Sequence, residues 1–194
     1  MTAFRELSQH ILDIFENGAK AGATLISLEI EEDFVIDLLA ITLHDNGSGM
    51  DAETLARITD PWVTSRTTRK VGLGIPFFKQ IAEMCNGDFE IISQLGEGTI
   101  TRAIFQHSHI DRPPMGDLVG TLTCMIVGYD ASADVAYRHR VRPTDEVWHE
   151  FTFDTREVRA ILGDEVPLSS PEVLAFLREM LQEGLLSLTA EPQG

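Results

Sequence analysis

The sequence predicts an α+β fold, because helix-like and strand-like patterns follow one another along its 194 residues. Residues 2–21 repeat apolar side chains three and four positions apart, which is typical of the buried side of a helix. Residues 24–32 instead alternate apolar and polar side chains, as a half-buried strand does. Two further strand-like segments flank Gly96-Glu97-Gly98, which predicts a tight turn between antiparallel strands.

The composition limits the classes of protein to which the chain can belong. Hydrophobic residues make up 43%, enough for one domain with a sizeable core, or for one domain with a small appendage. A formal net charge of −16 repels phosphate backbones and anionic membranes, so we expect neither nucleic acid nor membrane as a partner. The apolar runs are too short for a membrane span and the N-terminus lacks a signal-peptide core, so we expect a cytoplasmic protein.

Cys85 and Cys124 lie far apart and predict two buried thiols rather than a zinc site or a disulfide framework.

The helix predicted over residues 2–21 carries a polar pair. Asp13 and Asn17 are four residues apart, so their side chains lie on the same side of this helix. Ala21 continues their stripe with a small side chain, which leaves room for a flat ligand. A solvated polar face is the alternative interpretation of the pair.

A second strand is predicted over residues 34–44, and a glycine-rich stretch, DNGSGM at 45–50, follows it. Asp45 stands at the strand end, where an acidic residue can place one carboxylate at the floor of a pocket. Gly47 and Gly49 would let the backbone adopt left-handed angles and approach a ligand closely. Such letters are also common in ordinary turns, so the stretch predicts a site only if other segments complete it.

A basic segment and a second pair of glycines come next. Residues 51–58 are expected to form a short helix capped by Asp51, whereas residues 60–70 are polar, basic and without periodicity. That composition predicts either a mobile loop that contacts an anion or a merely solvated loop. The letters GLG at 72–74 open a helix predicted over residues 73–86, whose exposed N–H groups and positive dipole end would bind phosphate.

The rest of the chain predicts more strands and two helices. Strands are expected over residues 88–94 and 99–107, and two prolines within residues 107–116 mark a domain edge. Beyond that edge we expect strands at 117–128, 135–141 and 147–153, a short helix from a cap at Asp154 to Gly163, and a final helix from Ser170 to Gly184.

Taken in this order, the motifs resemble the ATP-binding domain of the GHKL superfamily, which includes histidine kinases, type II topoisomerases, MutL-type repair proteins and heat-shock chaperones. Residues 16–24 are similar to the N box, in wording closest to MutL, and residues 45–50 to the first glycine box. Residues 60–75 resemble the lid and second glycine box of histidine kinases, and residues 96–99 the last box.

The resemblance, which covers residues 1–106, implies the Bergerat ATP-binding fold. That fold is a two-layer α/β sandwich with a mixed, mostly antiparallel sheet covered by helices. We expect it to occupy residues 1–110, followed by a C-terminal α+β extension of unknown role over residues 111–194.

The same resemblance implies ATP and Mg²⁺ as cofactors. Asp45 would accept a hydrogen bond from the adenine amino group, and Thr99 would support that edge. Asn17 would offer its amide oxygen to Mg²⁺, a cation that prefers oxygen ligands. The glycines and the lid would contact the phosphates through Gly72, Gly74, Arg69 and Lys70. The other residues expected at the nucleotide are Ala21, Gly47, Gly49, Met50 and Leu73.

Asp13 occupies the position at which many relatives have a glutamate that activates the attacking group. A carboxylate there would act as a general base for water or for an acceptor side chain. Aspartate is a methylene shorter than glutamate, so a water-bridged structural role is the alternative.

A histidine kinase also needs a phospho-accepting histidine ahead of its ATP-binding domain, and only His10 precedes the N box here. His10 lies in the N-box helix, where it could not reach a γ-phosphate, and is expected to be a partly packed surface residue. The leading hypothesis is an ATP-dependent kinase-like or ATPase subunit that acts on, or signals to, a protein partner, with a serine or histidine acceptor and a homodimer both open. The alternatives are a nucleotide-sensing regulatory module without hydrolysis and a structural subunit with a vestigial site.

Overall fold

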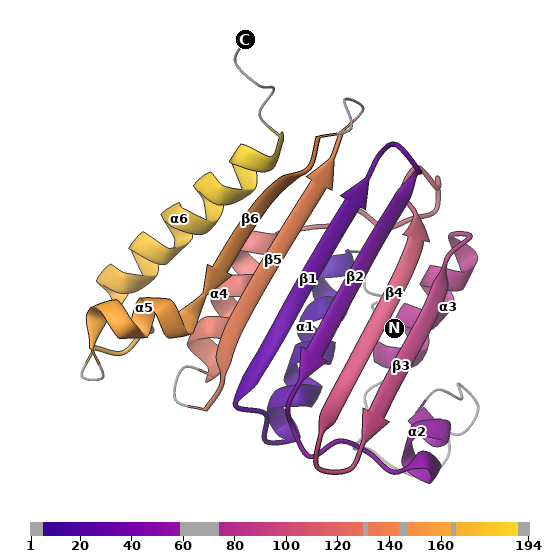
Figure 1. Cartoon of the computed structure of the whole chain (residues 1–194), viewed down its shortest axis with the longest axis horizontal. Coiled ribbons are helices and arrows are strands. Elements are labelled where there is room, and N and C mark those ends of the chain that lie inside the picture. The colour runs from indigo at the N-terminus through magenta and orange to yellow at the C-terminus, as the bar shows by residue number, and fades with distance from the viewer. Residues whose placement is uncertain (1–5, 59–73, 130–131, 144–146, 164–165, 190–194) are drawn as a thin grey trace.

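A computed structural model describes residues 6–58, 74–129, 132–143, 147–163 and 166–189. Helices cover one six-stranded sheet, whose strand order is β3-β4-β2-β1-β5-β6 (Figure 1). All neighbouring strands are antiparallel except β1 and β5. The strands are β1 (Leu25–Asp33), β2 (Leu38–Asp45), β3 (Asp88–Gln94), β4 (Gly98–Gln106), β5 (Asp134–Arg142) and β6 (His149–Asp154). The helices are α1 (Leu7–Lys20), α2 (Ala52–Ile58), α3 (Gly74–Met84), α4 (Leu118–Tyr129), α5 (Thr155–Leu162) and α6 (Pro171–Thr189).

The mixed, mostly antiparallel sheet with helices over it confirms the predicted α+β class and the Bergerat type of fold. Helices α1, α3 and α4 pack on the sheet, while α6 packs on α4 and along the edge strand β6. Between the layers lie large, fully buried side chains, among them Phe15, Phe78 and Phe105. Strand β4 alternates: Thr101, Ala103 and Phe105 are buried, whereas Ile100, Arg102 and Ile104 are partly or fully exposed.

Strand β2 begins at Leu38, so the prediction that it starts at residue 34 was wrong. The Asp33 carboxylate accepts hydrogen bonds from the N–H groups of Val35 (3.0 Å) and Ile36 (3.3 Å), which folds residues 34–37 into a turn. Asp37 completes this turn with a positive φ of 56°. An aspartate that caps its own turn outweighed the apolar letters that favoured a strand.

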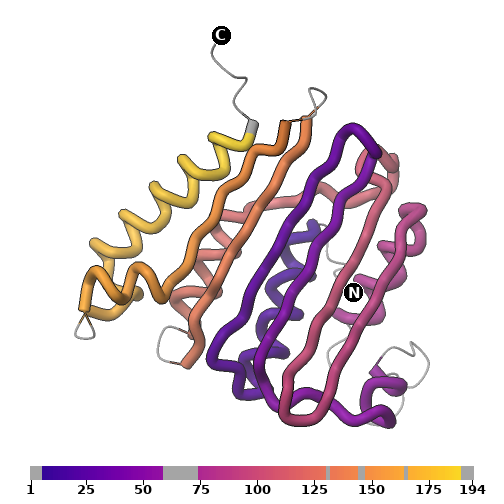
Figure 2. The backbone as a smooth tube through the Cα atoms, viewed as in Figure 1, coloured from indigo at the N-terminus to yellow at the C-terminus, as the bar shows by residue number. Residues whose placement is uncertain are grey.

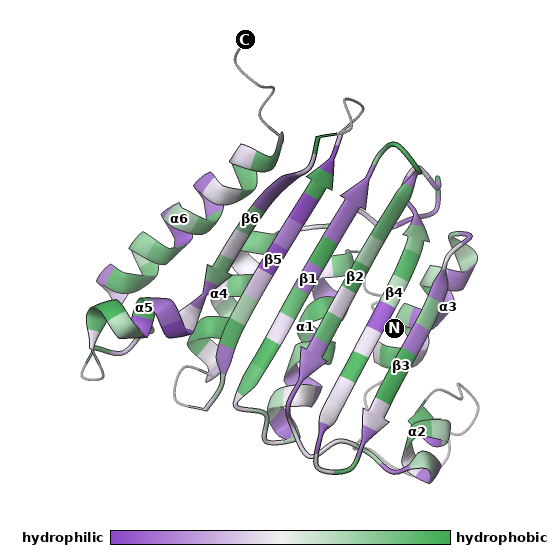
Figure 3. Ribbon diagram, in the orientation of Figure 1, coloured by the Kyte–Doolittle hydropathy of each residue, from purple (hydrophilic) through white to green (hydrophobic). Residues whose placement is uncertain are grey.

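The segment predicted as a strand over residues 117–128 is instead the helix α4, so this prediction was also wrong. Its twelve residues contain no charged side chain, and Figure 3 colours most of the helix as hydrophobic. A short apolar run rich in β-branched residues fits a buried strand as well as a buried helix, because its periodicity is lost. The helix packs against α1 and against α6, and its exposed positions hold Cys124, Val127 and Gly128 rather than charged residues.

Helix α6 continues to Thr189, although Gly184 was expected to end it. A β-carbon at Gly184 would lie 2.2 Å from the ring of Phe151, so glycine serves here to let strand β6 approach the helix. Helix α5 begins as predicted, with the Asp154 carboxylate accepting from the N–H of Arg156 at 2.9 Å.

The C-terminal part of the chain extends the sheet of the N-terminal part. Strand β5 lies directly beside β1 although the two are distant along the chain (Figure 2), and they pair over Leu25–Asp33 and Asp134–Arg142. Tyr129 at the end of α4 packs edge-on against Phe15 of α1, with ring centroids 5.5 Å apart. The predicted division at residue 110 therefore separates two stretches of sequence that share one hydrophobic core; as a boundary between units of function it stays a prediction.

Within the described ranges, no helix combines the length and the apolar character that a membrane crossing requires. Of the two cysteines, Cys85 is buried as expected, whereas Cys124 is exposed on α4 and corrects the other half of that prediction.

Candidate nucleotide-binding site

Asp45 ends strand β2 and is held by the loop that follows it. Its Oδ1 accepts a hydrogen bond from the N–H of Gly47 at 2.9 Å, and Thr99 is its direct partner across the β2–β4 pair. Burial raises the pKa of the Asp45 carboxyl, while the N–H groups of Gly47 and Thr99 partly offset this. The carboxylate is thus a half-buried acceptor at the end of a buried strand.

Three glycines allow close packing around Asp45 and the loop that follows it. A β-carbon at Gly18 of α1 would lie 2.8 Å from Cβ of Asp45. At Gly98 a β-carbon would lie 1.9 Å from the backbone oxygen of Asp45, and φ there is +105°. Gly49, with φ +61°, has only 1.9 Å between such a carbon and the backbone oxygen of Gln94. Any L side chain at these positions would displace the walls of the site.

Asn46 joins the loop to the strand that begins beside it, a role that the sequence analysis missed. Its Oδ1 accepts from the N–H groups of Thr24 (2.8 Å) and Leu25 (3.0 Å), and its Nδ2 donates to Oγ1 of Thr24 at 3.0 Å. Asparagine side chains often form hydrogen bonds with backbone groups in loops, so its place directly after a strand could have suggested this role. The bonds fix the loop relative to the C-terminal end of α1.

Ser93 is a second residue that sequence reasoning missed. Its hydroxyl donates to the backbone oxygen of Gly98 (3.0 Å), accepts from the N–H of Met50 (2.9 Å) and lies 2.9 Å from Oγ1 of Thr99. A hydroxyl has a single proton, so Thr99 is the donor of the last bond and keeps its lone pairs for another partner. Ser93 thereby connects the loop, the hairpin and Thr99.

Asp13 lies on α1 against the start of α3. Its Oδ2 is buried and has no hydrogen-bond partner among the residues that the structure describes. A β-carbon at Gly74 would lie 1.7 Å from this oxygen, so any larger residue there would require the Asp13 carboxylate to move. Burial is the main cause of the raised pKa of Asp13; the negative charge of Glu16 adds to it and Lys20 opposes it.

The structure brings most of the predicted site residues to one region. Asn17 and Ala21 continue the side of α1 that carries Asp13, and the backbone oxygen of Ala21 accepts from the N–H of Ser48 at 2.9 Å. A β-carbon at Gly47 would lie 3.0 Å from Cβ of Ala21, so helix and loop are in contact. Four of the predicted residues, Arg69, Lys70, Gly72 and Leu73, lie outside the described residues.

His10 departs from its prediction as a partly packed surface residue, because it is only 1% exposed. Its ring stacks on Phe78 of α3, with centroids 5.2 Å apart and planes at 14°. Burial lowers the pKa of His10 to about 4, against a smaller opposing effect of a hydrogen bond with the backbone of Gly74. His10 therefore fastens α1 to α3 beside Asp13.

These residues fit the groups that ATP and Mg²⁺ present. The Asp45 carboxylate is an acceptor at the end of β2, as an adenine amino group requires, and it packs closely against Gly18 of α1 and Gly98 of the hairpin. Near Asp13, the unpartnered carboxylate oxygen and the amide of Asn17 are hard oxygen donors that suit Mg²⁺. No group of three or more His, Cys, Asp or Glu side chains in the described part of the chain could hold a metal, but Mg²⁺ keeps several waters and needs fewer protein ligands.

Comparisons with known proteins agree with this geometry. The family described as histidine kinase-, DNA gyrase B-, and HSP90-like ATPase matches residues 2–109. A putative sensor protein of Shewanella frigidimarina is 35% identical over 103 residues, which are 52% of this chain and 16% of that protein. The non-motile and phage-resistance protein of Caulobacter vibrioides is 30% identical over 125 residues, 60% of this chain and 15% of that protein.

A probable C4-dicarboxylate sensor kinase of Bacillus subtilis is 34% identical over 80 residues, again 15% of that protein. The chain thus spans about a sixth of the length of these curated relatives. Because the family match covers more than half of the chain and the fold is the one expected, the chain belongs to the family of histidine kinase-, DNA gyrase B- and HSP90-like ATPases, with an ATP-binding domain of the histidine-kinase type.

Proposed function

We propose that this chain is the ATP-binding subunit of a protein-directed kinase or ATPase, and that it acts on or signals to a protein partner. The observation that carries the proposal is the half-buried carboxylate of Asp45, an acceptor that packs against Gly18, Gly47 and Gly98. The match to the ATPase family and the sensor kinases among the relatives support it.

In this proposal the adenine amino group donates to Asp45, and Thr99 supports the same edge of the base through a bridging water. The N–H groups at the start of α3, together with Arg69, Lys70 and Gly72, hold the phosphates. Asn17 would offer its amide oxygen to Mg²⁺, and the positive charge of the ion would offset the negative charge of the phosphate oxygens. Ala21, Gly49, Met50 and Leu73 line the remaining surface of the nucleotide.

Turnover would rest on Asp13. Its Oδ2 has no described hydrogen-bond partner and its pKa is raised, so it is suited to take the proton from the attacking water or from an acceptor hydroxyl. The alternative function, a nucleotide sensor without hydrolysis, is favoured by one observation: the same oxygen lies against Gly74 rather than toward open space.

Isothermal titration with ATP and Mg²⁺ tests the binding step. Asp45→Asn keeps the shape but replaces an acceptor by an amide, so we expect ATP affinity to fall by about 10- to 100-fold, as for a lost hydrogen bond to a charged group. Asp88→Asn removes the same charge from an exposed residue at the start of β3 and should leave affinity unchanged. Equal affinity of wild type and Asp45→Asn would remove Asp45 from the site, and no binding by the wild type would refute the proposal.

Steady-state phosphate release then separates an enzyme from a sensor. Release above background, or labelled γ-phosphate transferred to a serine or histidine of an added partner, is expected for the proposed function. Tight ATP binding with neither release nor transfer, in the presence of partner candidates, would favour the nucleotide sensor.

A further inference from the structure

A groove lies far along the sheet from the nucleotide site, between α5, α6 and the edge strand β6. Its volume is about 430 Å³, and its lining is mainly apolar. The apolar walls are formed by Val158, Ile161 and Leu162 of α5 and by Val173, Phe176 and Met180 of α6. The groove shares no residue with the site around Asp45.

Two of the largest side chains in this groove are open to solvent. Ile161 is 84% exposed and Phe176 is 59% exposed, whereas the next residue along α6, Leu177, and Leu181 one turn after it are buried. Contiguous exposed apolar surface of this kind marks an interaction site more often than scattered surface residues do. The exposure therefore indicates a surface that another molecule covers.

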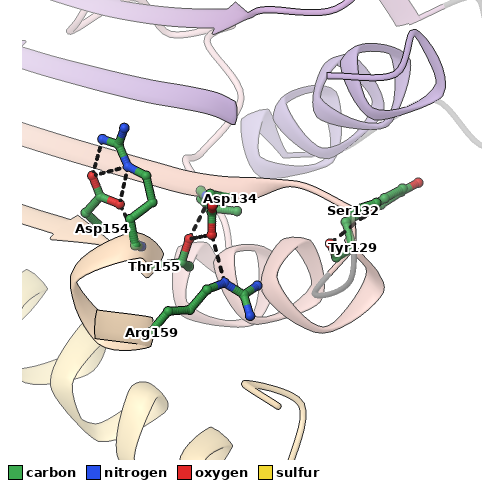
Figure 4. A network of polar contacts seen from close by, with 8 residues as sticks. Tyr129, Ser132, Asp134, Asp154, Thr155 and Arg159 are labelled. Atoms are coloured by element: carbon green, nitrogen blue, oxygen red, sulfur yellow. Dashed lines mark hydrogen bonds and ion pairs between the residues drawn. The ribbon is translucent and has the colours of Figure 1, made fainter. Parts of the chain in front are cut away.

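The walls of the groove are fixed in position. Thr155 at the start of α5 donates from Oγ1 to Oδ1 of Asp134 at 2.8 Å and accepts from the N–H of Val135 at 2.9 Å (Figure 4). Nε of Arg159, one turn later, donates to the same Asp134 oxygen at 2.9 Å. On the other side, Gly184 holds α6 against strand β6. A partner would thus meet a preformed groove and would not have to order it.

The charges at the rim have one sign. Asp154, Glu157 and Glu172 line the groove, and among the described residues no lysine or arginine does. Asp154 is paired with Arg156, but neither Glu157 nor Glu172 forms an ion pair with a residue that the structure describes. A second copy of the chain, with its own net charge of −16, would meet repulsion at this surface, whereas a basic partner would be attracted.

We propose that this groove binds an amphipathic helix of the protein partner, with an apolar face flanked by lysine or arginine. Both walls present apolar side chains at helical spacing, positions 158, 161 and 162 on α5 and 173, 176 and 180 on α6, and a third helix fits between two such ridges. The rim carboxylates of Glu157 and Glu172 would pair with its basic residues. The inference rests on the proposed function insofar as that function requires a protein partner.

The test uses a synthetic helical peptide of about 18 residues, with leucine at positions three and four apart and lysine along the flanks. Fluorescence anisotropy of the labelled peptide with the full chain is expected to show saturable binding. Ile161→Glu and Phe176→Glu should weaken it at least about tenfold, since each places a charge at the centre of the interface. Ile110→Glu, at a residue 94% exposed and outside the groove, is the matched control and should bind as the wild type does.

Two further peptides test the charge and the helix. A peptide with glutamate in place of every lysine should bind at least about tenfold more weakly, and a scrambled peptide without an apolar face should not bind. Equal binding by the groove variants, or by the glutamate peptide, would overturn the proposal. A concentration-dependent dimer in sedimentation that Phe176→Glu abolishes would overturn it in favour of a second copy of the chain. No nucleotide is present, so failure here leaves ATP binding at Asp45 untouched, and failure of the titration leaves this result standing.

Discussion

At the scale of single residues, the carboxylate of Asp13 destabilises the fold and is also the general base of the proposed function. Its raised pKa means that the folded state holds the proton more tightly than the unfolded chain does. The ionised carboxylate therefore destabilises the fold, and this cost is present at neutral pH and disappears as the pH falls through the pKa of the folded state. A buried carboxylate oxygen at the start of α3, without a hydrogen-bond partner among the described residues, is typical of a functional position.

Replacement of Asp13 by asparagine should separate the two effects. The amide of asparagine is neutral, so at pH 7 the variant does not bear the cost of burying a charge, and we expect the free energy of unfolding of the ATP-free protein to rise. Phosphate release should fall about 100-fold or more, because a general base is lost, while ATP affinity changes little. Thermal unfolding measures the change in stability, and a phosphate-release assay measures the change in turnover; Asp88→Asn is the charge-matched control. An Asp13→Asn variant less stable than the wild type would contradict the claim that the buried charge destabilises the fold.

At the scale of elements, the contact between α1 and α3 depends on a neutral histidine. The pKa of His10 is lowered from 6.5 to about 4, so acid protonates the unfolded chain before the folded one. The stability that this contact contributes is therefore lost as the pH falls from about 6.5 toward 4, by about 3 kcal/mol over the whole range. Asp13 and Asp45, with raised pKa values, change in the opposite direction.

His10→Gln should isolate the histidine contribution, since glutamine keeps a donor for the backbone of Gly74 but does not titrate. Urea unfolding at pH 7 and pH 4.5 is expected to show that the wild type loses about 2 to 3 kcal/mol more than the variant. The carboxylates are common to both proteins and cancel in the difference. An equal loss in the two proteins would mean that His10 is not buried as a neutral ring.

The same scale shows where sequence reasoning succeeds. Helices α1 and α3 were predictable because each has one buried side, and the β3–β4 hairpin because a glycine turn joins its strands. Helix α2 was predictable from its cap, Asp51, whose carboxylate accepts from the N–H of Thr54 at 2.7 Å. Helix α4 was not, because its exposed positions hold no charged residues and it lacks the polar face on which the prediction relies. Gly184 was misleading because its reason is a distant ring, that of Phe151.

Site residues divide in the same way. Asp45 and Asn17 could be proposed because their motifs are local, whereas Gly18 and Ser93 matter through contacts across the fold. Nothing in the neighbouring letters reveals that a β-carbon at Gly18 would reach Asp45. Whether two residues distant in the sequence are in contact depends on how the strands and helices pack together, and this cannot be predicted from a single sequence.

At the scale of the whole molecule, the sheet does not end where the family match ends. The match stops at residue 109, yet β1 is an inner strand only because β5 and β6 lie beyond it. Without them, the edge of β1 that pairs with β5 along nine residues would present unpaired N–H and C=O groups. Phe15 would also lose its contact with Tyr129.

A chain cut after residue 110 should therefore fail to reach the native state. We expect it to aggregate in size-exclusion chromatography and to lack a cooperative thermal transition, whereas a chain cut after residue 189 should unfold as the full chain does. A monomeric 1–110 fragment with a sharp transition and ATP binding would contradict this expectation and would establish the N-terminal part as an independent domain.

The parallel pairing of β1 with β5 also has a consequence for synthesis. Roughly a hundred residues separate the two strands along the chain, so β1 waits on the order of ten seconds for its partner at usual rates of translation. During that interval the growing polypeptide exposes an apolar strand edge and the uncovered side of α1. Closure of so long a loop also makes folding slow. The molecule is thus most vulnerable to misassembly before its last third has left the ribosome, and chaperones that recognise open strand edges have their longest opportunity there.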